Sequence, residues 1–334
     1  MSEALPEYLL QVDNLTKHYP VHGGIFFRLT GKVHALNGVS FNLRSGETLG
    51  IVGESGCGKS TLGKTLLRLH HPTGGTVLFN GIDLCSLSGR EMTARRKDLQ
   101  MIFQDPYESL NPRHTVGDIL EEPFVIHGVG DTSFRRNEVL RLLKRVGLPE
   151  NAINRFPHEF SGGQRQRIGV ARAIALKPKI VVCDEPASAL DVSVQSQVLN
   201  LLMELQEEMK LTYIFISHAL PVVKLISDRV MVMYLGKIME FTDSQTIYEK
   251  PYHPYTMALI SAIPEPDPEK KGNRIILEGD IPSSHSLPTG CPFASRCAHA
   301  TSLCRNTAPA LDSAPGTAGD SHLVACHYAG KIKL

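Results

Sequence analysis

The sequence predicts an α/β fold with a mainly parallel core sheet, and three observations lead to this expectation. Short apolar runs with strand character alternate with stretches of helical periodicity. One of the apolar runs passes through a glycine-rich loop directly into a helical stretch. Near the N-terminus, alternating apolar and polar residues separated by turns predict an antiparallel sheet beside the core.

Four short apolar runs are the expected strands of the core sheet. They are Thr48–Val52, Ile180–Cys183, Tyr213–Ile216 and Val230–Met233. Apolar residues at helical spacing predict two helices, one through Val139, Leu142, Leu143 and Val146 and one through Val198, Leu201, Leu202 and Leu205. Gly147 and Pro149 end the first of these helices. The stretches 33–43 and 74–84 are the expected antiparallel strands.

The composition indicates a globular chain of about two domains, because 334 residues include 42% hydrophobic and 21% charged residues. A net charge of +1 gives no electrostatic footprint for nucleic acid, so no nucleic-acid partner is expected. No apolar run approaches the length that spans a bilayer, and the acidic N-terminus is unlike a signal peptide. The chain is therefore expected in the cytosol, where clustered cysteines indicate metal ligands and not disulfides.

Cysteine placement divides the chain into two parts. Cys57, Cys85 and Cys183 are scattered, whereas the other four cysteines gather near the C-terminus. A proline-rich, charged stretch begins at Pro264, between the two groups. We expect a large domain over residues 1–250 and a small C-terminal extension over residues 251–334.

Residues 53–60 fit the phosphate-loop pattern G-x-x-x-x-G-K-[ST], with a strand before them and a helix after them. Glycines let the backbone wrap a phosphate chain with its N–H groups, and the helix N-terminus adds partial positive charge. Lys59 is expected to reach the β- and γ-phosphates and Ser60 to bind Mg²⁺, whereas Cys57 is expected to be a small spacer. The expected nucleotide contacts are Gly53, Glu54, Ser55, Gly56, Cys57, Gly58, Lys59, Ser60 and Thr61.

Two carboxylates follow an expected core strand directly. Asp184 is suited to hold the Mg²⁺ shell, and Glu185 is suited to polarise an attacking water. The simpler alternative is that these two acidic residues only end the strand and have no catalytic role. The combination with a phosphate loop earlier in the chain favours the catalytic interpretation.

The run Ser161-Gly162-Gly163-Gln164-Arg165-Gln166-Arg167 precedes a helical stretch. Ser161 is a good N-cap, and a helix start with two exposed glycine amides can receive phosphate. Because the chain already has one phosphate loop, a second anion site suggests the nucleotide of a partner chain. An ordinary capped helix is the alternative.

Together, the SGGQRQR run, the phosphate loop before it and the DEP sequence after it resemble the ATP-binding subunit of ABC transporters, over about residues 8–250. The resemblance implies a P-loop NTPase fold of the ABC nucleotide-binding type. Such a domain has a RecA-like parallel core sheet, an antiparallel β subdomain and a helical subdomain. The resemblance also implies that residues 161–164 of one subunit complete the ATP site of the other.

The resemblance implies roles for residues outside these motifs. Tyr19 resembles the aromatic residue that stacks on adenine, and Gln104 resembles the glutamine that links Mg²⁺ and water to the transmembrane partner. Asp191 lies in a segment that resembles the loop crossing the dimer interface. His218 resembles the switch histidine, which contacts the γ-phosphate and would act with Lys59 and Glu185 in catalysis. The family usually has Asp after that histidine, where this chain has Ala219.

Four cysteines of the extension form a candidate metal site with the spacing C-x5-C-x6-C-x21-C. They are Cys291, Cys297, Cys304 and Cys326. Four thiolates suit either Zn²⁺ or an iron–sulfur cluster, and the spacing alone does not choose between them or exclude four free thiols. His299, His322 and His327 lie nearby in the sequence and could replace a ligand.

The HPYT sequence at 253–256 and the CPF-x-x-RC sequence at 291–297 are similar to the extension of dipeptide, oligopeptide and nickel importers. The resemblance covers about residues 248–328. It implies a peptide-import ATPase whose four cysteines hold a [4Fe–4S] cluster, with Zn²⁺ as the alternative. The cluster would be a structural staple or a redox sensor.

The implied protein is an ATP-hydrolysing subunit at the cytoplasmic face of the inner membrane, with ATP and Mg²⁺ as its other cofactors. Its implied partners are two transmembrane permease subunits, a homologous companion ATPase in a heterodimer, and a periplasmic or extracellular substrate-binding protein. The alternatives are an importer ATPase for nickel or another small cargo, a non-transport ABC-type ATPase, and an inactive regulatory cassette. The sequence does not choose the cargo.

Overall fold

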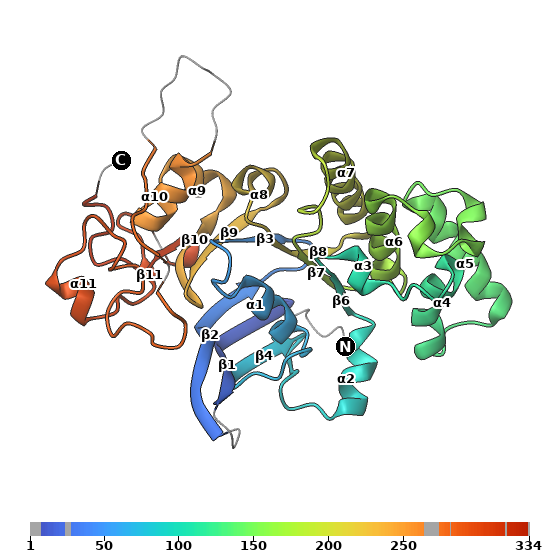
Figure 1. Cartoon of the computed structure of the whole chain (residues 1–334), viewed down its shortest axis with the longest axis horizontal. Coiled ribbons are helices and arrows are strands. Elements are labelled where there is room, and N and C mark those ends of the chain that lie inside the picture. Colours follow the sequence, from blue (N-terminus) through green and yellow to red (C-terminus); the bar gives the residue numbers. More distant parts are fainter. Residues whose placement is uncertain (1–7, 24–27, 264–273, 281, 318, 333–334) are drawn as a thin grey trace, which may run out of the picture. The chain divides into compact units, whose positions relative to one another are not determined.

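The computed structural model describes residues 8–23, 28–263, 274–280, 282–317 and 319–332 (Figure 1). The chain divides into two compact units, each described separately below. The first contains Met1–Leu43, Leu49–Cys85 and Ser217–Leu334, and the second contains Arg44–Thr48 and Ser86–Ile216. The proline-rich stretch at 264–273 lies outside the described residues.

An antiparallel sheet in the first unit confirms the prediction from the alternating N-terminal stretches (blue in Figure 1). Its strands are β1 (Leu10–Gly23), β2 (Arg28–Leu43), β4 (Gly74–Phe79) and β5 (Ile82–Asp83), in the order β2-β1-β4-β5. Leu10 and Val12 are buried and pair with Phe79 and Val77 of β4. Because side chains alternate along a strand, this spacing places both residues of β1 on the same face of the sheet.

A second sheet in the first unit contains the strand that leads into the phosphate loop. This strand, β3 (Thr48–Val52), pairs in parallel with β9 (Arg229–Tyr234), as the two apolar runs predict. The chain then turns through Leu235 and Gly236, whose φ angles of 46° and 73° suit a two-residue hairpin. As a result, β10 (Lys237–Asp243) pairs antiparallel with β9.

Two short strands from the C-terminal part of the chain extend this sheet beyond β10. β12 (His322–Val324) pairs antiparallel with β10, and β11 (Asp312–Ser313) pairs antiparallel with β12. The sequence does not predict these strands, because each is too short to give a pattern of its own. The sheet of the first unit is therefore mixed, with a parallel pair and an antiparallel edge.

Three parallel strands lie at the centre of the second unit. They are β6 (Leu99–Ile102), β7 (Ile180–Asp184) and β8 (Thr212–Ile216), in the order β8-β7-β6. Every residue of β7 and β8 is buried. A fully buried parallel strand has apolar residues on both faces, which explains why these runs are continuous and do not alternate.

The helices of the second unit include the two that periodicity predicts, α5 (Thr132–Arg145) and α7 (Val192–Met209). Gly147 has a φ of 72° just after α5, as expected for a residue that ends a helix. The other helices are α2 (Gly89–Arg96), α3 (Pro106–Ser109), α4 (Val116–Ile126) and α6 (Gly162–Ile174), with 3₁₀ turns at Glu150–Asn154 and Pro157–Glu159.

Among its described residues, the first unit contains α1 after the phosphate loop and four helices nearer the C-terminus. They are α1 (Lys59–Leu66), α8 (Leu220–Ile226), α9 (Ser244–Glu249), α10 (Pro254–Ser261) and α11 (Ser302–Asn306), with a 3₁₀ turn at Gly319–Ser321. Within the described parts of the chain, none of the helices has both the length and the apolar character needed to cross a bilayer.

Candidate active site

The phosphate loop lies between β3 and α1 and depends on glycine at two positions. The φ angles of Gly53 and Gly58 are 152° and 107°, a region that side chains disfavour. A Cβ atom at Gly53 would lie 2.2 Å from the carbonyl oxygen of Met233, and one at Gly58 would lie 2.4 Å from that of Ala35. The loop therefore packs so closely against neighbouring backbone that larger residues do not fit at either position.

Lys59 is the first residue of α1, directly after the loop, and is 5% exposed. Its Nζ donates hydrogen bonds to the carbonyl oxygens of Gly53 at 2.7 Å and Glu54 at 3.0 Å. Cys57 is also buried, with its sulfur 3.8 Å from the same Nζ. Burial raises the pKa of the Cys57 thiol, and Lys59 opposes this only in part. An uncharged thiol is a poor nucleophile, which supports the interpretation of Cys57 as a spacer.

The first turn of α1 follows the loop directly. Its N-cap, Gly58, is in a left-handed conformation, and no side chain caps the helix. Ser60 and Thr61 are half-buried in this first turn. A helix N-terminus of this kind offers backbone N–H groups and partial positive charge to an anion.

The acidic pair lies at the C-terminal end of β7 in the second unit. Asp184 is the last residue of the strand and is 2% exposed. Glu185 has a φ of 46°, and its N–H donates to the carbonyl oxygen of Ile216 at 2.9 Å. Gln104, which follows β6, donates from Nε2 to Oε2 of Glu185 at 3.2 Å, so the structure brings these two predicted residues together.

Ser161 is the N-cap of α6, as the sequence predicts. Its Oγ accepts the N–H of Gln164 at 3.3 Å, and the Gln164 Oε1 accepts the N–H of Ser161 at 3.0 Å. This reciprocal arrangement is a capping box. A Cβ atom at Gly163 would lie 2.2 Å from Cγ1 of Val194, so glycine allows α6 to approach α7 closely. Ser161 and Gln164 are exposed at the tip of the helix.

The other predicted site residues have local roles that the structure defines. Asp191 is the N-cap of α7, since its Oδ1 accepts the N–H of Val194 at 3.0 Å. The half-buried ring of Tyr19 packs edge-on against His70, with the ring centroids 5.7 Å apart. His218 is exposed after β8, and the next residue, Ala219, is the N-cap of α8 and makes no side-chain capping hydrogen bond.

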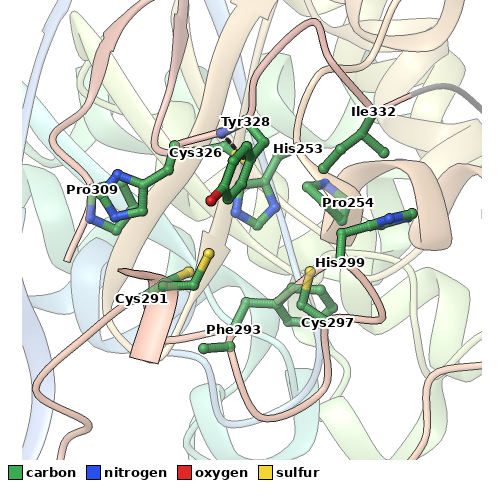
Figure 2. Close-up of a pocket in the computed structure, with 13 residues that line it drawn as sticks. His253, Pro254, Cys291, Phe293, Cys297, His299, Pro309, Cys326, Tyr328 and Ile332 are labelled. Atoms are coloured by element: carbon green, nitrogen blue, oxygen red, sulfur yellow. Dashed lines mark hydrogen bonds between the residues drawn. The ribbon is translucent and has the colours of Figure 1, made fainter. Parts of the chain in front are cut away.

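The four cysteines of the extension line one cavity of about 20 Å³, whose walls are mostly apolar. Figure 2 shows the side chains of Cys291, Cys297 and Cys326 around it, and Cys304 is a further lining residue. Burial, with smaller contributions from the other three thiols, raises the pKa of Cys291 to about 11. Among the described residues, no three His, Cys, Asp or Glu side chains are arranged to hold a metal ion.

The histidines near the cysteines differ from one another. His299 and His327 line the cavity. His322 is not among the residues that line the cavity, and its Nε2 lies 2.8 Å from Oε1 of Glu240 in a buried pair. The Glu240 carboxylate also accepts the N–H groups of Tyr252 at 2.7 Å and His253 at 3.0 Å. This pair links β12 to β10.

Comparison with known proteins identifies the family. The family model described as ABC transporter matches residues 36–188, and the one described as oligopeptide/dipeptide transporter, C-terminal region, matches residues 239–304. The oligopeptide transport ATP-binding protein AppF of Bacillus subtilis is 51% identical over 332 residues, which cover 98% of this chain and 99% of AppF. This chain belongs to the ATP-binding proteins of ABC transporters.

Solved ABC cassettes confirm the fold of this ABC transporter ATPase. The dimeric cassette MJ0796, in a post-hydrolysis state bound to ADP and Pi, is 31% identical with a TM-score of 0.63. That match covers 70% of this chain and 98% of MJ0796. CbiO1 of Clostridium perfringens, part of the ABC transporter complex cbiONQ, is 27% identical with a TM-score of 0.62, covering 73% of this chain and 92% of CbiO1. The P-loop NTPase fold predicted for the ATPase core is therefore correct.

The predicted ATP-site residues of this ATPase fall into both units. The phosphate loop, Tyr19 and His218 belong to the first unit, whereas Gln104, Ser161 and the acidic pair belong to the second. Sequence reasoning missed two residues that contact the phosphate loop, Tyr255 and Arg296. Both lie within sequences quoted for the family resemblance, HPYT and CPF-x-x-RC, but nothing in their spacing indicates what they contact.

Proposed function

We propose that this ABC transporter ATPase drives the import of peptides. The observation that carries the proposal is the match of one chain to the ABC transporter model and to the oligopeptide/dipeptide C-terminal model. AppF, named as an oligopeptide transport protein, supports the same cargo class. Nickel or another small cargo is the alternative. The proposed partners are two permease subunits, a companion ATPase and a substrate-binding protein, with this chain at the cytoplasmic face of the inner membrane.

In the proposed site, the phosphate loop binds the triphosphate of ATP through its backbone N–H groups and Lys59. At Gly53 and Gly58 the loop has no side chain that could stand between its backbone and a phosphate chain, which fits this role. Ser60, Gln104 and Asp184 are the residues proposed to hold Mg²⁺. When bound, this ion neutralises charge that develops on the phosphate oxygens.

Glu185 is the proposed general base. Its carboxylate would accept a proton from the attacking water, and the hydrogen bond from Gln104 holds it in a defined orientation. His218 is proposed to contact the γ-phosphate, and Tyr19 to stack on the adenine.

We propose that two ATPase subunits enclose the nucleotides between them. The exposed capping box of Ser161 places a helix N-terminus at the surface, where it can reach a nucleotide on a partner chain. The dimeric state of MJ0796 supports this arrangement. Loss of the γ-phosphate would weaken the closed dimer, because its binding energy favours closure.

The test uses the complete importer, reconstituted in vesicles with its permeases and binding protein. Glu185→Gln is expected to keep ATP binding and to lower the hydrolysis rate by about a hundredfold or more, since a positioned base contributes about that much. Glu207→Gln, on the exposed face of α7, is the matched control. Hydrolysis by Glu185→Gln at the wild-type rate would contradict the assignment of the base. Uptake of Ni²⁺ without uptake of a labelled oligopeptide would contradict the cargo.

We further propose that the four cysteines hold a [4Fe–4S] cluster, with Zn²⁺ as the alternative. The number and type of donors suit either group, because four thiols line one cavity and both groups accept four cysteine ligands. The cluster would tie together a small region that has little core of its own. Iron, sulfide and zinc analysis of anaerobically purified protein tests this, with Cys85→Ser as control for Cys291→Ser. A colourless protein that contains zinc would refute the cluster.

A further inference from the structure

Two side chains from the C-terminal part of the chain form hydrogen bonds to the phosphate loop. The Oη of Tyr255, on α10, accepts the N–H of Glu54 at 2.8 Å. The guanidinium of Arg296 donates to the Glu54 carboxylate through both of its terminal nitrogens, at 2.6 Å and 3.1 Å. Neither residue belongs to the ATP site proposed above. Both act on the same residue of the loop.

Glu54 is consequently held at all three of its polar groups. Its N–H donates to the Oη of Tyr255, its carboxylate accepts from Arg296, and its carbonyl oxygen accepts from Lys59. Glu54 is the second residue of the loop, directly after Gly53. Because the loop is already fixed at Glu54, it loses less conformational entropy when it binds phosphate.

The packing around Arg296 shows how it reaches the loop. Residues 291–300 form a series of turns with little regular backbone hydrogen bonding. Phe293, in these turns, is 1% exposed and packs against the rings of Tyr234 and Tyr255, at centroid distances of 5.4 Å and 5.3 Å. These aromatic contacts pack the turns against β9 and α10 of the same unit, and Arg296 reaches Glu54 from there.

The pairing of Arg296 with Glu54 is unlike an ordinary surface ion pair. The side chain of Arg296 is 7% exposed and that of Glu54 is 28% exposed. The hydrogen bonds to Glu54 also raise the pKa of Arg296. A two-pronged bond between a planar guanidinium and a carboxylate fixes direction as well as distance. Without Arg296, a shielded negative charge would stand beside a loop that binds anions.

We propose that Arg296 and Tyr255 are positioning residues for ATP binding, which hold Glu54 and thereby keep the phosphate loop in the conformation that receives the phosphates. The inference rests on the nucleotide site proposed above. It assigns to the C-terminal part of the chain a direct part in the ATPase cycle. This role in ATP binding does not depend on a metal held by the cysteines, although Arg296 adjoins Cys297 in sequence.

The expected result is a change in ATP affinity with little change in maximal rate. Arg296→Ala is expected to raise the ATP Kd of the full-length chain, and the ATP KM of the importer, about tenfold, the range for a charged hydrogen bond. Tyr255→Phe is expected to raise both about fivefold, since it removes one neutral bond. The kcat at saturating ATP is expected to stay within about twofold, because bound phosphates order the loop themselves.

Each variant has a matched control. Arg305→Ala removes an exposed arginine that also adjoins a cysteine of the extension. Tyr248→Phe removes a hydroxyl that donates to the carbonyl oxygen of Leu220 and has no contact with the loop. Both controls are expected to keep the wild-type Kd, KM and iron or zinc content.

The decisive measurement is the same substitution in a Glu54→Gln background. If Arg296 acts through the Glu54 carboxylate, Arg296→Ala will change the Kd less than twofold there. A tenfold effect in both backgrounds, or a lower kcat with unchanged Kd, would overturn the inference and indicate a general structural role. Lys59→Ala separates this inference from the site proposal. If Lys59→Ala still binds ATP normally, the proposed ATP site is wrong. If Lys59→Ala loses ATP binding but Arg296→Ala binds ATP like the wild type, only the positioning role of Arg296 is refuted.

Discussion

Ser161 gives the most discriminating prediction, because its structural and functional roles respond differently to one substitution. In the isolated chain its hydroxyl caps α6 through the N–H of Gln164. In the proposed dimer the same helix tip contacts the γ-phosphate on the partner chain. Alanine removes both properties, whereas aspartate keeps the cap and adds a negative charge.

The cap sets the size of the structural effect. Replacing an N-cap serine by alanine costs about 1 kcal/mol, and aspartate caps a helix as well as serine does. Ser161→Ala is therefore expected to lower the free energy of unfolding by about 1 kcal/mol, and Ser161→Asp to leave it almost unchanged. A carboxylate about 4 Å from a phosphate oxygen costs about 4 kcal/mol at an effective dielectric constant near 20. That energy corresponds to about a thousandfold weaker contact with the nucleotide.

The assays are urea unfolding of the purified chain and ATP hydrolysis by the reconstituted importer. Ser161→Asp is expected to unfold like the wild type and to show almost no hydrolysis. Ser88 supplies the control, because it caps α2 through the same reciprocal arrangement with Glu91. Ser88→Asp is expected to preserve both properties. Full ATPase activity in Ser161→Asp would refute the shared site, whatever its stability.

Three further predictions concern stability. Glu240 is fully buried with three donors, so Glu240→Ala is expected to lower the free energy of unfolding by about 3–6 kcal/mol, and an unchanged urea midpoint would contradict this. Burial lowers the pKa of His253 to about 4, with Glu240 opposing. As the pH falls, the imidazole of His253 is therefore protonated at a higher pH in the unfolded chain than in the folded chain. The free energy of unfolding consequently decreases by about 3 kcal/mol as the pH falls from about 6.5 to 4. His253→Asn, which can still cap α10 by accepting the N–H of Tyr255, should flatten that slope in pH-dependent unfolding. Ala219 is the N-cap of α8 but has no side chain that can cap the helix, so Ala219→Asp is expected to stabilise the chain by about 1 kcal/mol, and no rise in melting temperature would refute it.

The sequence predicts those parts of the fold whose signal is local. The run Thr48–Val52 is bounded by polar residues and glycine and coincides with β3. Ser161 predicts its own helix start because a capping box lies within four consecutive residues. In each case the residues that determine the structure are neighbours in the chain.

The sequence does not predict the parts that depend on distant pairing. β12 has three residues and is a strand only because β10 offers it an edge. His322 shows the same limitation, because its position near four cysteines indicates a metal ligand. Its buried partner is instead Glu240, which is 82 residues away in sequence. Local composition cannot reveal a partner at that distance.

The position of Glu54 shows why such a distant pairing matters for function. The phosphate-loop pattern leaves its second position free, so the pattern alone gives no reason for a carboxylate beside an anion site. A negative charge there repels phosphate unless a cation neutralises it and holds it to one side. Arg296 does both, from a position 242 residues further along the chain. A carboxylate that would weaken ATP binding in the loop alone thus becomes the point at which the C-terminal part of the chain holds the loop.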